Sequence, residues 1–104
     1  MNYKRELKFL KDLKFSDDET LRYYFTRFYN TAINYANAQK RIQECNARTD
    51  PGRIMAGEAA KTASFVNLGD LARIATEINR EINKEELPIN KQDLIGLAEL
   101  VTKS

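Results

Sequence analysis

The chain has 104 residues, of which 42% are hydrophobic and 31% are charged, a balance that predicts a folded protein and disfavours intrinsic disorder. A chain of this length makes one domain, residues 1–104, with room for a modest core. Lys and Arg number 17 against 15 Asp and Glu, so the net charge is +2 and a strongly basic, non-specific nucleic-acid binder is not indicated.

Cysteine and membrane signals are both sparse. Cys45 is the single cysteine, which excludes a disulfide within the chain and suits a reducing compartment. No stretch reaches the ~18 uninterrupted apolar residues of a membrane span. The N-terminal residues 1–14 are charged throughout, where a signal peptide has an apolar region. We therefore expect a cytoplasmic protein that has no membrane partner.

Residues 2–14 have the spacing of a short amphipathic helix. Tyr3, Leu7 and Leu10 share one stripe, and lysines occupy much of the other side. A basic amphipathic helix can contact a membrane surface or nucleic acid. Because Glu6 and Asp12 dilute the charge, we favour a docking helix with a solvated basic side.

The long segment from Ser16 to Arg48 contains no Pro and no Gly. Its apolar stripe alternates steps of four and three residues, which predicts one long helix: Leu21, Phe25, Phe28, Ala32, Tyr35, Gln39 and Ile42. Ser16 followed by Glu19 fits a capping box, and Asp17 and Asp18 also suit a helix N-terminus. The same carboxylates could suggest a metal site, but the chain has no His to support one.

The next break is the sequence RTDPG at residues 48–52. Asp50 suits a helix N-cap and Pro51 the first helical position, so a second long helix should run from Pro51 to about Glu86. A connection this short makes the two helices antiparallel. Gly69 could divide the second one, yet its apolar stripe keeps its phase, which favours a continuous helix: Phe65, Leu68, Ala72, Ala75, Asn79 and Ile82.

A last short helix should follow Pro88, with Asn90 as its N-cap, because its apolar residues are spaced as one helical face: Leu94, Leu97, Ala98 and Val101. The predicted fold class is all-α: a helical hairpin of two long antiparallel helices flanked by short N-terminal and C-terminal helices, forming a bundle. Two short helices cannot cover two long ones, so we also predict a homo-oligomer.

Candidate catalytic groups are weakly supported. Cys45 has no His to activate it, and the glycines at 52 and 57 lack the Lys and Ser or Thr of a phosphate-binding loop. Arg73, Glu77 and Arg80 are spaced as a surface ion-pair ladder. The same three could serve a small all-α enzyme with an anionic substrate, a less favoured alternative. We predict no catalytic residues, no metal, no cofactor and no small-molecule substrate.

The most distinctive surface lies on the first long helix, opposite its apolar stripe. It combines Arg, amide and Tyr side chains: Tyr23, Arg27, Asn30, Asn34, Asn37, Arg41 and Arg48, with Arg53 beyond the turn. These groups suit a polar protein interface, and they also suit phosphates and exposed bases. We predict a non-catalytic binding protein (a regulator, inhibitor, adaptor or assembly subunit) with a protein partner or self-association. The alternative is an RNA- or DNA-binding protein that uses the same surface.

Overall fold

The computed structural model describes residues 3–46 and 51–103, without the side chains of residues 46, 51 and 53. These ranges form four helices: α1 (Lys4–Lys14), α2 (Glu19–Asn46), α3 (Pro51–Ile82) and α4 (Lys91–Lys103). No strand occurs in the described part of the chain. The all-α prediction is confirmed, and the predicted turn residues 48–50 lie outside the described residues.

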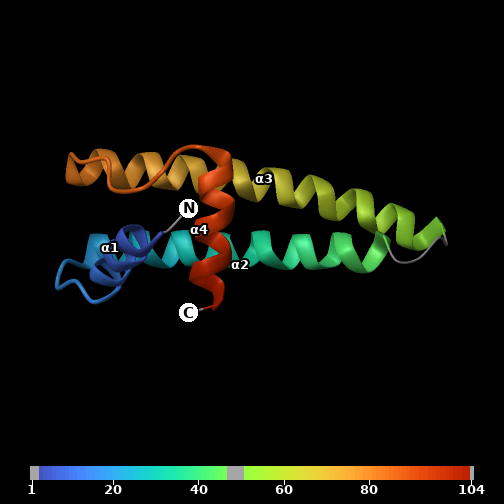
Figure 1. The fold of residues 1–104 in the computed structure, drawn as a ribbon, viewed down its shortest axis with the longest axis horizontal. Coiled ribbons are helices and arrows are strands. Elements are labelled where there is room, and N and C mark those ends of the chain that lie inside the picture. The colour runs from blue at the N-terminus through green and yellow to red at the C-terminus, as the bar shows by residue number, and fades with distance from the viewer. Residues whose placement is uncertain (1–2, 47–50, 104) are drawn as a thin grey trace.

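The long helices α2 and α3 lie side by side along the longest dimension of the molecule (Figure 1). Contacts between them pair Arg27 with Glu77 and Gln39 with Ser64, so residue numbers rise along one helix as they fall along the other. The longest extent is 50 Å, close to the ~48 Å length expected for the 32 residues of α3. The Cα radius of gyration, 15.1 Å, exceeds the ~13 Å of a compact domain of this size.

The hydrophobic core lies where all four helices meet, toward the N-terminal end of α2 and the C-terminal end of α3. α1 lies beside α2, and α4 crosses both long helices (Figure 1). Phe28 is fully buried and belongs to one cluster with aliphatic side chains from the other three helices: Leu10, Leu13, Leu71, Ile74, Ile78, Leu94, Leu97 and Val101. The predicted α2 stripe is therefore confirmed as the inner side of this helix.

The start of α2 differs from the prediction. The helix begins at Glu19, where Asp18 Oδ1 accepts a hydrogen bond from the Thr20 N–H at 2.9 Å. Ser16 Oγ instead accepts the Asp18 N–H at 3.0 Å, which closes a turn before the helix. The predicted capping box of Ser16 and Glu19 is wrong. Asp18 is the N-cap residue, and its side chain already accepts an otherwise free N–H of the first turn.

Helix α3 continues through Gly69, as predicted, but it ends at Ile82, short of Glu86. Asn83 has a φ of 56°, in the left-handed region that Asn tolerates better than most residues. The Asn83 N–H donates to the Arg80 carbonyl at 3.2 Å, and the Lys84 N–H donates to the Asn79 carbonyl at 3.1 Å. This is the Schellman arrangement, which stops a helix without proline.

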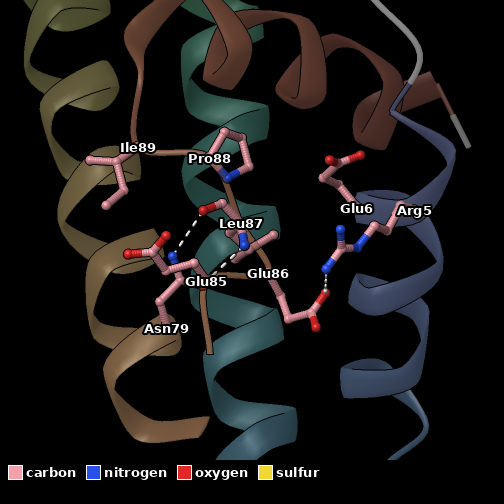
Figure 2. Close-up of a pocket in the computed structure, with 8 residues that line it drawn as sticks. All are labelled: Arg5, Glu6, Asn79, Glu85, Glu86, Leu87, Pro88 and Ile89. Carbon is pink, nitrogen blue, oxygen red and sulfur yellow. Dashed lines mark hydrogen bonds and ion pairs between the residues drawn. The ribbon is translucent and has the colours of Figure 1, made fainter. Parts of the chain in front are cut away.

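The segment 83–90 returns along α3 to reach the start of α4. Within it, Leu87 is held by two hydrogen bonds to the Asn79 side chain (Figure 2). Asn90 then caps α4, since its Oδ1 accepts the Gln92 N–H at 2.8 Å. The predicted Asn90 cap and the predicted inner face of α4 are both confirmed.

One predicted core position of α3 is wrong. Phe65 is 69% exposed, and the buried residues that α3 contributes to the hydrophobic core are Leu71, Ile74, Ala75 and Ile78. Of these four, only Ala75 belongs to the predicted stripe. Phe65 lies outside the part of α3 that packs in the hydrophobic core, and the ammonium of Lys91, at the start of α4, lies 5.2 Å from the centre of its ring.

Candidate functional site

The polar surface predicted on α2 borders α3, and its residues line two hollows in the groove between the long helices. The proximal hollow, about 390 Å³, is lined by Arg27, Asn30, Thr31, Asp70, Arg73 and Ile74. The distal hollow, about 190 Å³, is lined by Asn34, Asn37, Ala38, Arg41, Ala59, Ala60 and Ala63. The structure thus brings five of the predicted residues into one groove, together with α3 residues that periodicity could not assign to it.

Positive charge in the proximal hollow is largely neutralised by acidic groups of α3. Arg27 Nη1 lies 2.9 Å from Glu77 Oε2, and Arg73 Nη2 lies 3.7 Å from Asp70 Oδ1. The predicted ladder along α3 is therefore wrong, because Glu77 pairs across the groove with α2. A sequence pattern within one helix could not reveal this partner, since the Arg27 side chain comes from the neighbouring helix.

The distal hollow has a different character. On the α3 side it is lined by Ala59, Ala60 and Ala63, whose small side chains would let a partner molecule come close to the α3 backbone. Arg41 is exposed, and it has no carboxylate partner in residues 3–46 and 51–103. Asn34 and Asn37, also exposed, add amide donors and acceptors beside it. This hollow therefore retains free polar and cationic groups.

Tyr23 lies near the start of the same surface and is 59% exposed. The Arg27 guanidinium carbon lies 5.8 Å from the centre of its ring, a cation–π distance. An exposed ring beside an Arg can stack on a planar group or fill a pocket in a protein partner. Of the remaining predicted residues, Arg48 lies outside the described residues, as does the Arg53 side chain.

A third hollow, about 310 Å³, lies beside the segment 83–90 (Figure 2). Arg5 Nη2 pairs with Glu86 Oε2 at 3.3 Å, and the Asn79 side chain is hydrogen-bonded to the backbone of Leu87. Glu6 Oε2 is buried and has no hydrogen-bond partner in the described part of the chain. Sequence reasoning missed this hollow because α1 and the segment 83–90 are far apart in the chain, and most of its polar groups serve to hold that segment in place.

Sequence reasoning also missed an apolar groove formed by α1, α2 and α4, about 840 Å³ in volume. Leu7 was recognised as apolar, but the pattern of a single helix does not show that the neighbouring helices leave this side chain half-buried. Phe15 also lines this groove, and it is 75% exposed.

The described residues contain no group of three or more Cys, Asp or Glu side chains placed to hold a metal ion. None of the helices in residues 3–46 and 51–103 is long and apolar enough to cross a lipid bilayer. Comparison of the chain with models of protein families, with curated proteins and with solved structures finds no match.

Proposed function

We propose that this chain is a non-catalytic binding protein that presents an antiparallel helical hairpin to a protein partner, a second copy of the chain included. The contact surface is the distal hairpin, residues 36–46 of α2 and 51–67 of α3. One observation carries the proposal: the four-helix core ends near Tyr35 and Leu68, and beyond it the described parts of α2 and α3 pack mainly against each other.

The distal hairpin exposes large apolar side chains while burying mainly small ones. Ile54, Met55, Phe65 and Val66 are each more than half exposed. The residues buried between the helices are Ala38, Cys45, Gly57, Ala60 and Ser64. Exposed apolar groups beside polar ones are typical of protein–protein contact surfaces. Asn37 and Arg41, which line the distal hollow, supply the polar part of the same surface.

Site-specific photo-crosslinking tests this proposal. A benzophenone side chain at Met55 or Phe65, in cells that naturally make the protein, should give a discrete protein adduct identifiable by mass spectrometry. The matched control is the same group at Glu85, which is also exposed but lies in the segment 83–90, beyond the opposite end of α3. Equal adducts at Glu85, or no protein adduct at Met55 and Phe65, would contradict the proposal.

Size-exclusion chromatography with light scattering identifies the kind of partner. A mass that is a multiple of 12.0 kDa and is reduced by Phe65→Ser would assign the distal hairpin to self-association. A mass of 12.0 kDa together with a crosslinked foreign protein would assign it to another chain.

The second candidate function is RNA or DNA binding through Tyr23, Arg27, Asn30, Asn34, Asn37, Arg41, Arg48 and Arg53. The exposed Tyr23 ring favours it, as does Arg41, which forms no ion pair among the described residues. The Arg27–Glu77 pair and Asp70 reduce the positive charge of the same groove. Phosphate contacts release counterions, so affinity should fall steeply between ~50 and ~200 mM salt. Fluorescence anisotropy with mixed RNA and DNA tests it, and the absence of binding at the lower salt would eliminate it.

A further inference from the structure

The apolar groove lies at the end of the molecule away from the distal hairpin, between α1, α2 and α4. Its lining contains six apolar or aromatic side chains and two lysines: Leu7, Leu10, Phe15, Phe25, Tyr29 and Val101, with Lys11 and Lys14. The groove is open to water, since Phe15 is 75% exposed and Leu7, Phe25 and Tyr29 are only half-buried. The rings of Phe25 and Tyr29 stack, with centroids 5.8 Å apart, and form a flat part of its wall.

The charge of this groove has one sign. The Lys14 ammonium lies 5.4 Å from the centre of the Phe15 ring and 5.9 Å from that of Phe25. Within the described ranges, neither Lys11 nor Lys14 forms an ion pair, and no carboxylate lines the groove. Helix α1 carries five basic and two acidic side chains, a net charge of +3 against +2 for the whole chain.

From this complementarity we propose that the groove binds an acidic amphipathic helix of a partner protein. Its apolar residues, spaced i, i+3, i+4 and i+7, would cover Phe25, Tyr29 and Phe15. Its flanking Asp or Glu residues would meet Lys11 and Lys14, whose attraction speeds association and sets orientation. This surface is separate from the distal hairpin, so the inference goes beyond the function proposed above.

A partner helix suits this surface better than a bound acyl chain or a membrane does. A single acyl chain in an open groove would leave much of its surface in water, whereas a helix brings a polar outer side of its own. Direct insertion of α1 into a membrane would require its apolar face, but Leu10 and Leu13 are already buried in the core. A carboxylate-flanked helix uses both the apolar lining and the charges of Lys11 and Lys14.

The test is selection from a displayed library of helices in which the apolar spacing is fixed and the flanking positions are random, with the purified full chain as bait. We expect enrichment of Asp and Glu at the flanking positions. Binding of the selected helices, measured by fluorescence anisotropy, should weaken about tenfold or more with Phe15→Ser and with Lys14→Glu. The matched controls are Ile89→Ser and Lys84→Glu, exposed positions outside both the groove and the distal hairpin that should leave the affinity unchanged. Circular dichroism should show that all four variants are folded.

Several results would overturn the proposal. These are failure to enrich any helix, enrichment of neutral or basic flanks, and selected helices that bind Phe15→Ser and Lys14→Glu as tightly as the wild type. Self-association abolished by Phe15→Ser would assign the groove to a second copy, and saturable binding of dodecanoate lost in Phe15→Ser would assign it to an amphiphile. Crosslinks from Met55 and Phe65 report separately on the distal hairpin, so the two proposals can fail independently.

Discussion

The Asn79 side chain forms the hydrogen bonds that a neighbouring strand would give to the backbone of Leu87. Its Nδ2 donates to the Leu87 carbonyl at 2.8 Å, and its Oδ1 accepts the Leu87 N–H at 3.0 Å. Both groups are buried, with Asn79 7% and Leu87 3% exposed. Since buried backbone polar groups require partners, this pair of hydrogen bonds lets the irregular segment 83–90 enter the core.

We expect Asn79→Ala to lower the free energy of unfolding by about 2–4 kcal/mol, because it leaves a buried N–H and a buried C=O without partners. Urea denaturation followed by circular dichroism measures the change. Asn30→Ala, at an exposed position of α2, is the control and should change stability by less than ~0.5 kcal/mol. A small effect at Asn79 would mean that water replaces the side chain and that the segment 83–90 is loosely held.

Phe28 and Phe65 provide a direct test of the core assignment, since one is 0% and the other 69% exposed. Phe28→Ala should cost about 3–5 kcal/mol through lost burial and a residual cavity. Phe65→Ala should cost less than ~1 kcal/mol. Denaturation of the two variants side by side gives the comparison, and similar losses would show that Phe65 is covered in solution, as self-association through the distal hairpin would require.

Two glycines within α3 should respond differently to alanine. A Cβ added at Gly69 meets no other atom within 4 Å, so Gly69→Ala should stabilise the protein by roughly 0.5–1 kcal/mol through helix propensity. A Cβ at Gly57 would lie 3.2 Å from the Cβ of Cys45, where α2 and α3 approach closely. Gly57→Ala should therefore gain less than Gly69→Ala, and thermal melts can rank the two. Equal gains would indicate that the distal ends of α2 and α3 separate easily.

Arg27 and Arg41 lie on the same surface of α2 but have different surroundings. Arg27→Ala should cost at most ~1 kcal/mol, since its ion pair with Glu77 is partly exposed and screened by solvent. Arg41→Ala should leave stability within ~0.5 kcal/mol of the wild type while weakening partner binding. Unfolding measurements combined with the crosslinking yield from Met55 test both expectations. A large stability loss at Arg41 would contradict its placement on an exposed surface.

Tyr3 should make stability fall at alkaline pH. Burial, together with the Asp93 carboxylate that accepts the Tyr3 hydroxyl at 3.3 Å, raises the pKa of Tyr3 above its usual value of 10.0. The folded state therefore holds the phenol proton more tightly, and this contribution, complete below about pH 10, is lost as pH rises through the folded-state pKa.

Unfolding measured between about pH 8 and 11 should show this loss, and Tyr3→Phe should flatten the alkaline slope. Asp93→Asn removes the negative charge while keeping an acceptor, so its slope should be intermediate. An unchanged slope in Tyr3→Phe would assign the alkaline loss to other groups.

Local chemistry in the sequence determined the helices and several of their boundaries. Periodicity identified the inner face of α2 around Phe28, and the Asn90 cap set the start of α4. Continuity of the apolar stripe indicated that α3 passes through Gly69. These features depend on residues within one or two helical turns of each other, and such spacing can be read directly from the chain.

The tertiary structure decided which faces are covered, and over what length. The position of α4 decides that the core includes Leu71 but not Phe65. The neighbouring helix decides that Glu77 pairs with Arg27. The apolar groove likewise depends on how α1, α2 and α4 meet. Periodicity places residues on a common side of a helix, but burial and pairing depend on groups that distant parts of the chain bring to that side.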